Sequence, residues 1–367
     1  MKILFIAPLP PPVTGHSIAA EVLCDHLKLT HEVEVVDLSV GSSNDGSISR
    51  RRILEVGKVL TRVWRGRRGA DVVYLTVAES VAGNIKDLLI YLLCARLLSR
   101  FYIHLHGGSI KKLLFDRHPI LRWLNSLAIG RMAGVIVTGG SHEHIFAPMI
   151  AQSRIHLVPN FALDELFVPD AAVAGKFADT SLLRVLYISG MTAGKGYQDL
   201  ADAYLGLGAD VKRRVRVDFA GKFDTEVERA QFTRQIAGDA GIYYHGLVGG
   251  ETKRRLFSEA HVFCLPTTMF EGQPISILEA YASACLVLAT GQDGIRDVFT
   301  DAVNGVEILQ RCPKSIAATL TRLSRAPGEV VMIATKNHQV AKRSYRVARF
   351  TTRMDKILSD TATRNES

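Results

Sequence analysis

Several motifs that would suggest a function at once are missing from this sequence. It has no Gly-x-Gly-x-x-Gly fingerprint, no Walker A phosphate loop and no metal-chelating Asp-x-Asp. Its five cysteines are scattered without a Cys-x-x-Cys pair, which is typical of reduced cytosolic thiols without structural zinc. The longest strongly apolar run, residues 88–95, is far below the roughly 20 residues of a spanning helix. The apolar start, residues 1–7, is too short for a signal peptide, so we expect a cytoplasmic protein.

The positive charge of the chain is concentrated in one segment. The net charge is +9, and residues 50–68 carry eight Lys or Arg against one Glu. Apolar residues recur there near helical spacing, at Ile53, Val56, Leu60, Val63 and Trp64. Such a basic amphipathic helix predicts binding to an anionic membrane surface. Nucleic acid is disfavoured because Trp64 is the one stacking aromatic in the segment. The alternative is a helix whose apolar stripe packs on its own domain.

The order of apolar runs predicts the fold class. Runs of strand length alternate with helical patterns in both halves of the 367-residue chain, which predicts two α/β domains with parallel sheets covered on both faces. Residues 161–179 lose this periodicity and predict the linker. We therefore expect an N-terminal domain over 1–165, a second domain over 180–344 and a C-terminal helix over 345–367. The stretch 330–358 reads as one long basic helical region.

Residues 270–280 form the stretch on which the functional interpretation depends. A buried strand over 260–266 precedes a short loop, and a helix follows Pro274, which suits a first helical turn. The N–H groups of Ile275, Ser276 and Ile277 can then face an anion at the helix start. Glu271 lies in the loop, and Glu279 lies about one turn into the helix. The alternative is structural, with Ser276 and Glu279 forming a capping box.

The sequence Glu-Gly-Gln-Pro-Ile-Ser-Ile-Leu-Glu-Ala resembles the paired-glutamate signature of retaining glycosyltransferases of family 4, especially those of bacterial exopolysaccharide and lipopolysaccharide synthesis. The resemblance implies two Rossmann-like domains of the GT-B type with an interdomain cleft, the N-terminal one binding the acceptor and the C-terminal one the nucleotide sugar. The same resemblance implies that the C-terminal helix over 345–367 returns to pack on the N-terminal domain. It also implies that Glu271 contacts hydroxyls of the donor sugar and that Glu279 holds the ribose of the nucleotide. The backbone from Gln273 through Pro274 to Ile277 would meet the sugar and the diphosphate.

A second phosphate candidate lies in residues 190–196, between a strand and a helix. It resembles the Lys-Gly element of the same family, in which Lys195 would pair with the donor diphosphate and Gly194 would line its site. Many members carry an arginine where Gly190 and Met191 stand here, so this chain departs from the pattern. Lys222 is the nearby cation that could compensate.

Two further positions in the first half follow from the resemblance. Gly15 ends a proline-rich loop that would lie over the donor diphosphate and the acceptor. His106 matches the histidine near the donor sugar, and His104 is expected to pack behind it. The pairs His104/His106 and His142/His144 could bind a metal, but no acidic partner supports this, so no metal site is expected.

The chemistry implied is transfer of a sugar with retention of its anomeric configuration, through an oxocarbenium-like centre, while a diphosphate leaves. Lys195 and the helix amides would neutralise the leaving group, and Glu271 and His106 would hold the sugar. We expect a nucleotide-diphosphate sugar as donor, a glycan or lipid-linked glycan as acceptor, no metal or other cofactor, and a place on the inner face of the plasma membrane. A nucleotide-sugar 2-epimerase and a non-catalytic glycan-assembly subunit are the alternatives.

Overall fold

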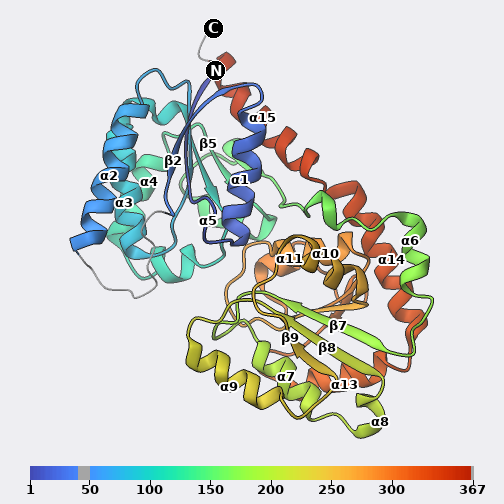
Figure 1. Cartoon of the computed structure of the whole chain (residues 1–367). Coiled ribbons are helices and arrows are strands. Elements are labelled where there is room, and N and C mark those ends of the chain that lie inside the picture. The colour runs from blue at the N-terminus through green and yellow to red at the C-terminus, as the bar shows by residue number, and fades with distance from the viewer. Residues whose placement is uncertain (40–49, 365–367) are drawn as a thin grey trace. The chain divides into compact units, whose positions relative to one another are not determined.

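The computed structural model describes residues 1–39 and 50–364, except for the side chains of residues 51, 52 and 361–364. Within that range the chain forms two compact units, each built on its own six-stranded parallel sheet (Figure 1). The first unit comprises Met1–Asn160, Phe270–Gln273 and the C-terminal part from Ala348. The second comprises Phe161–Met269 and Pro274–Val347. The predicted α/β class with two parallel sheets is confirmed.

The first sheet has the strand order β2-β1-β3-β4-β5-β6. Three of its inner strands, β3, β4 and β5, are buried along their whole length, as in the run Val72–Thr76, because helices cover both faces of a parallel sheet. The elements are β1 (Lys2–Ala7), α1 (Gly15–Leu27), β2 (Glu32–Asp37), α2 (Arg50–Gly66), β3 (Val72–Thr76), α3 (Val81–Leu93), the 3-10 helix η1 (Ala95–Arg100), β4 (Phe101–Leu105), the π-helix η2 (Ile110–Phe115), α4 (Pro119–Ile129), β5 (Gly134–Val137), η3 (Gly140–His142), α5 (Glu143–Phe146), η4 (Gln152–Arg154) and β6 (Ile155–Leu157).

The second sheet has the order β12-β11-β10-β7-β8-β9. Its elements are η5 (Asp164–Leu166), α6 (Asp170–Lys176), β7 (Leu183–Ile188), α7 (Tyr197–Leu205), α8 (Ala209–Lys212), β8 (Val215–Ala220), α9 (Glu226–Ile236), β9 (Ile242–Tyr244), α10 (Gly250–Glu259), β10 (Val262–Leu265), α11 (Ile275–Ala282), β11 (Leu286–Ala289), α12 (Asp293–Arg296), β12 (Gly305–Glu307), α13 (Pro313–Leu323) and α14 (Pro327–Ser344). The chain ends in α15 (Val347–Arg364), most of which belongs to the first unit.

The C-terminal region differs from the single helix expected over 330–358. It consists of α14 and α15, which are separated at Tyr345 and Arg346. The carbonyl of Tyr345 accepts a hydrogen bond from the N–H of Ala162 at 2.8 Å, in place of the next turn of helix. A contact with a distant segment therefore ends α14, and local periodicity could not show it. In the same way, helix α6 lies inside the segment expected to be an irregular linker.

The basic helix α2 uses part of its apolar stripe within its own unit. Val63 is fully buried, and Leu60 packs against the core of the first sheet. Ile53 and Trp64 remain exposed, at 63% and 45%. One part of the stripe predicted to face a membrane therefore packs on the domain to which the helix belongs, as the alternative expected. The other part faces solvent. Arg51 and Arg52, which belong to this charged segment, have side chains outside the described part.

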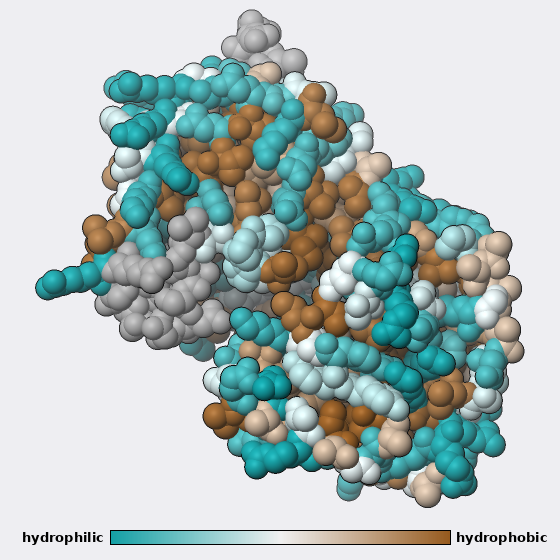
Figure 2. Space-filling view, viewed as in Figure 1, coloured by the Kyte–Doolittle hydropathy of each residue, from teal (hydrophilic) through white to brown (hydrophobic). Residues whose placement is uncertain are grey.

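The surface is mixed rather than uniformly polar. Figure 2 shows polar side chains over most of the visible face, with apolar side chains in separate groups among them. No described helix combines the length and the apolar character needed to cross a lipid bilayer.

Candidate functional site

The candidate residues of the second unit gather at the carboxyl ends of neighbouring strands. Strand β7 lies between β10 and β8. The chain adds β8 and β9 on one side of β7 and β10 to β12 on the other, so the strand order reverses between β7 and β10. Ligands of open α/β sheets bind outside the carboxyl ends of the strands at such a point. The loop with Lys195 follows β7, and the loop with residues 266–274 follows β10. The fold thus places the two predicted phosphate-binding elements side by side.

Glycine is required where these two loops meet. Gly194 and Gly196 have positive φ angles of 89° and 80°. A Cβ on Gly196 would lie 2.0 Å from the carbonyl oxygen of Pro266. The N–H of Thr268 donates to the carbonyl of Gly194 at 2.7 Å. The two loops are therefore in direct contact, and Lys195 is held, partly buried, between the two glycines.

Helix α11 starts as an anion-binding helix would, without a side-chain cap. Pro274 is the N-cap residue, no side chain caps the helix, and helical geometry begins at Ile275. The capping-box alternative for Ser276 and Glu279 is therefore wrong. The N–H of Ile277 donates to the carbonyl of Pro274 at 3.2 Å, so the amides of Ile275 and Ser276 are the ones left to face an anion.

Glu279 is already paired inside the second unit. Its carboxylate accepts a hydrogen bond of 2.6 Å from Nζ of Lys253 on α10, and the Glu279 side chain is 2% exposed. Burial raises the pKa of Glu279, and the charge of Lys253 acts in the opposite direction. The spacing of the two glutamates did not indicate this partner.

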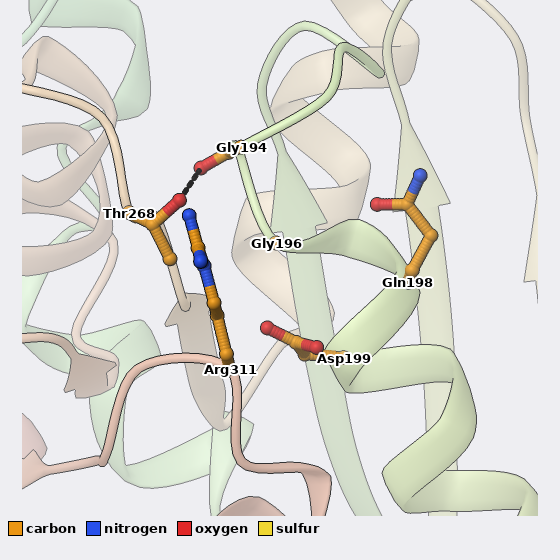
Figure 3. Close-up of a pocket in the computed structure, with 6 residues that line it drawn as sticks. All are labelled: Gly194, Gly196, Gln198, Asp199, Thr268 and Arg311. Atoms are coloured by element: carbon orange, nitrogen blue, oxygen red, sulfur yellow. Dashed lines mark hydrogen bonds between the residues drawn. The ribbon is translucent and has the colours of Figure 1, made fainter.

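A polar pocket lies beside the Lys195 loop. It has a volume of about 180 Å³ and is lined by Gly194, Gly196, Gln198, Asp199, Thr268 and Arg311. Figure 3 shows the Arg311 side chain reaching past Asp199 toward Thr268 and Gly194. Burial raises the pKa of Asp199, a neighbouring Asp202 adds to this, and Arg311 opposes it. The pocket therefore offers both hydrogen-bond donors and acceptors.

Arg311 is a cation that the sequence analysis missed. It follows β12 and has a φ of 51°, an unusual value for a residue other than glycine. The sequence has no arginine at position 190 or 191. Arg311 instead brings a positive charge to the same loop, from the end of another strand. The feature that could have identified Arg311 in the sequence is its position shortly after the edge strand β12. Lys222, the predicted compensating lysine, is exposed, and its carbonyl accepts from the N–H of Met191 at 2.9 Å.

The candidate residues of the first unit form a separate group around the end of β4. A Cβ on Gly272 would lie 1.8 Å from the carbonyl oxygen of His106, and one on Gly108 would lie 2.3 Å from that of Glu271. The backbone of residues 271–272 therefore rests directly on the loop that follows β4. The structure brings Glu271 and His106 into one neighbourhood, although they are far apart in the sequence.

Gln273 holds this loop in place with its side chain. Its Oε1 accepts from the N–H of Asn160 at 2.6 Å, and its Nε2 donates to the carbonyl of Thr138 at 2.9 Å. Its backbone carbonyl accepts from Nδ2 of Asn160 at 2.8 Å. Both polar atoms of the side chain and the backbone carbonyl oxygen are thus used inside the protein.

Glu79 is another residue that the sequence analysis did not single out. One of its carboxylate oxygens accepts from both the N–H and the hydroxyl of Ser109, each at 2.5 Å. A Cβ on Gly107 would lie 1.5 Å from the other oxygen. Glu79 follows β3, next to the reversal of strand order between β1 and β3, and this position was the available signal. It fixes the loop that carries His106.

Three histidines stack at the same place. His16 and His106 have ring centroids 4.5 Å apart, and His106 and His104 have centroids 3.9 Å apart. Nδ1 of His104 lies 2.7 Å from the hydroxyl of Tyr74, so His104 packs behind His106 as expected. The buried Nε2 atoms of all three have no hydrogen-bond partner within the described residues. Gly15, the predicted loop glycine, is the first residue of α1, directly before His16.

Burial keeps these histidines neutral. Desolvation lowers the pKa of His16 to about 4 and that of His104 to about 3. It also holds the pKa of His106 well below its usual range, and the two neighbouring rings add to this. A neutral His106 can donate or accept a hydrogen bond to a hydroxyl. Among the described residues, no group of three or more His, Cys, Asp or Glu could hold a metal ion.

This cluster predicts a loss of stability in acid. Below pH 6.5 the histidines take up protons in the unfolded chain but not in the folded one, so the free energy of unfolding falls as pH falls toward 4. At about 1.4 kcal/mol per pKa unit, His16 alone contributes about 3 kcal/mol of this loss. Urea unfolding from pH 7 to pH 4.5 should show a weaker pH dependence for His16→Gln than for the unchanged chain. The exposed His144→Gln is the control, and equal slopes for all three proteins would contradict the interpretation.

Comparison with known sequences supports a glycosyltransferase relationship for the second half. Residues 183–326 match the model of the family described as "Glycosyl transferases group 1". Two proteins of Methanocaldococcus jannaschii, both named uncharacterized glycosyltransferase, are 24% identical over 139 residues and 22% identical over 157 residues. These alignments span 38% and 42% of this chain and 35% and 38% of the relatives.

Comparison with solved structures extends the likeness to the whole fold. The Anabaena protein HepE, solved in complex with UDP-glucose, has a TM-score of 0.73 at 14% identity, covering 98% of this chain and 100% of that one. Sucrose-phosphate synthase of Thermosynechococcus elongatus gives the same TM-score and identity, with 98% of each chain covered. The GT-B fold predicted from the sequence is thereby confirmed.

Proposed function

We propose that this chain is a retaining glycosyltransferase that moves a sugar from a nucleotide-diphosphate donor to a glycan acceptor in bacterial surface polysaccharide synthesis. The observation that carries the proposal is the pair of adjoining loops after β7 and β10. One loop carries Lys195 and the other leads into the uncapped start of α11, and both lie within a segment that matches the glycosyltransferase group 1 model. A lysine and a helix N-terminus together attract a diphosphate.

The roles of the residues follow from the charge that develops during transfer. As the bond between the sugar and the diphosphate breaks, negative charge grows on the leaving phosphate. Lys195 and the amides of Ile275 and Ser276 stabilise that charge without moving, because the glycine contacts fix their loops. Glu271 and the neutral His106 hold hydroxyls of the donor sugar. Glu279 holds the ribose of the nucleotide with its partner Lys253.

The donor, the acceptor and the location belong to the same proposal. Because HepE was solved with UDP-glucose, a UDP-sugar is the first donor to test. The acceptor is a lipid-linked glycan, and the protein works as a peripheral protein on the inner face of the plasma membrane. Chemistry at the sugar needs no metal in this scheme because the cations of the chain neutralise the diphosphate.

Two alternatives remain distinguishable by experiment. A nucleotide-sugar 2-epimerase of similar fold would convert the donor in the absence of any acceptor. A non-catalytic assembly subunit would not bind a donor, and the missing arginine near Gly190 is the feature that favours it.

Calorimetry with a panel of nucleotide sugars tests the proposal. We expect one sugar nucleotide to bind with a stoichiometry of one, equally well with and without EDTA. The matching nucleoside diphosphate should compete with it, since both would use the Lys195 loop and α11. Failure of every sugar nucleotide and nucleoside diphosphate to bind the folded protein would contradict the proposal and favour the assembly subunit.

A further inference from the structure

Helix α3 turns a row of large apolar side chains toward solvent. Val81, Ile85, Leu89 and Leu92 are between 38% and 72% exposed. Their spacing of four, four and three residues places them in one stripe along the helix. Isolated exposed apolar side chains are ordinary, but four in one stripe on one helix are not.

Helix α4 carries a second row with a tryptophan in it. Ile120, Trp123, Leu124 and Leu127 follow helical spacing and are between 37% and 72% exposed, and Trp123 is 60% exposed. Leu121 of the same helix packs inward against the core of the first sheet. The helix therefore has one apolar side for its own domain and another apolar side that the described chain leaves uncovered.

The two rows belong to one surface. Helices α2, α3 and α4 lie next to one another along one flank of the first sheet (Figure 1). Asn84 of α3 and Asn125 of α4 are buried and exchange side-chain hydrogen bonds of 3.2 and 2.9 Å, which fixes the two helices against each other. We refer to the outward rows, Val81, Ile85, Leu89, Leu92, Ile120, Trp123, Leu124 and Leu127, as the α3–α4 face.

The charges around the α3–α4 face are almost all positive. Residues 81–131 contain eight Lys or Arg and two Asp. Asp87 is buried and Asp116 is paired with Lys111 at 3.1 Å, so neither presents an open negative charge to a partner. Arg117, Arg122 and Arg131 are exposed on or beside α4. An apolar face with a basic border complements an anionic lipid surface.

We propose that the α3–α4 face is the surface by which the protein docks on an anionic lipid bilayer, with Trp123 inserted at the interface. Helix α2 would then contribute charge near the headgroups, because the inner half of its apolar stripe is used by its own domain. The inference rests on the proposed function, in which the acceptor is lipid-linked and the enzyme gains from working at the membrane surface.

The chain provides its own reporters for this proposal, because it contains two tryptophans, Trp64 on α2 and Trp123 on α4. In Trp64→Phe, the fluorescence of Trp123 should shift to shorter wavelength when phosphatidylglycerol vesicles are added at low salt. In Trp123→Phe, the emission of Trp64 should shift much less. Neither variant should respond to phosphatidylcholine vesicles, and 0.5 M NaCl should weaken the response to phosphatidylglycerol.

Vesicle flotation of the full-length chain supplies the second measurement. The pair Ile120→Ser and Leu127→Ser should lower the bound fraction about tenfold or more, since apolar area is removed from the docking face. The matched pair Leu309→Ser and Met332→Ser changes exposed apolar residues of the second unit and should leave binding unchanged. Circular dichroism and donor calorimetry on the same proteins show that they are folded.

Three results would overturn the docking proposal. These are a shift of Trp64 without a shift of Trp123, equal binding to neutral vesicles, and a Trp123 shift that depends on protein concentration without lipid. The last would assign the face to a second copy of the chain. Each of these results can occur while the protein still binds its donor, so each would contradict the docking proposal and not the proposed function. Absence of donor binding in the unchanged chain would contradict the proposed function instead.

Discussion

Replacing Lys195 with alanine is expected to lower the turnover number by about 10²–10³-fold, the scale for losing one fixed group that stabilises developing charge. Lys195 lies between Gly194 and Gly196, and the backbone contacts of these two glycines with residues 266–268 fix the shape of the loop. The free energy of unfolding should therefore change by no more than about 0.5 kcal/mol. Steady-state rates and a urea unfolding curve on the same protein check both parts.

Glu271→Ala should likewise lower the turnover number strongly with little change in stability, because it removes the carboxylate proposed to hold the donor sugar and keeps the backbone contact with Gly108. Lys314→Ala is a suitable control, since it removes an exposed lysine at the start of α13. If Lys195→Ala unfolds at much lower urea, or turns over as fast as Lys314→Ala, then Lys195 does not have the role proposed for it.

Glu279→Gln is expected to affect both binding and stability. Loss of the charged acceptor for the ribose should weaken donor binding by about 1–3 kcal/mol. The substitution also leaves Lys253 without its carboxylate, and removing one partner of a buried pair costs up to about 3–5 kcal/mol. Calorimetry and denaturant unfolding measure the two effects separately.

The double variant Glu279→Gln with Lys253→Met separates these roles. It removes both charges of the pair, so most of the lost stability should return. Donor affinity should stay low, because the acceptor for the ribose is still absent. Recovery of full donor affinity in the double variant would show that Glu279 serves the structure alone.

The fold was accessible from the sequence because it depends on local patterns. Continuous apolar runs such as Val72–Thr76 identify strands buried on both faces, and their alternation with helices leaves a parallel sheet as the natural arrangement. Pro274 after β10 likewise indicates a helix start, although it proves to be the N-cap rather than the first helical residue.

Other features depend on residues far apart in the chain, and no local pattern carries them. Gln273 bonds to Asn160 and Thr138, and Glu279 pairs with a lysine on another helix. His16 enters the cluster through a stack with His106, ninety positions later. The sequence thus indicated which loops form the candidate site, while the partners that hold its side chains in place required the structure.

The prediction of a membrane-binding helix was limited in the same way, because a sequence pattern does not show which apolar side chains are exposed. Periodicity and charge directed attention to α2, where a basic stripe is obvious, but Val63 and Leu60 of that stripe face the core. On α4, both sides of the helix are apolar, so the pattern resembles a fully buried helix. Only the fractional exposures separate Leu121, which packs inward, from Trp123, which does not.

The most direct test of the proposed function is transfer of label from a sugar nucleotide to lipid. The purified chain is incubated with the donor identified by calorimetry, radiolabelled in its sugar, and with membranes from the organism that encodes it. We predict that label enters the organic phase in equal amount to the nucleoside diphosphate released, and that Lys195→Ala lowers the rate of both by about 10²–10³-fold. Consumption of the donor at the same rate without membranes, with the label left in water-soluble products, would contradict the account.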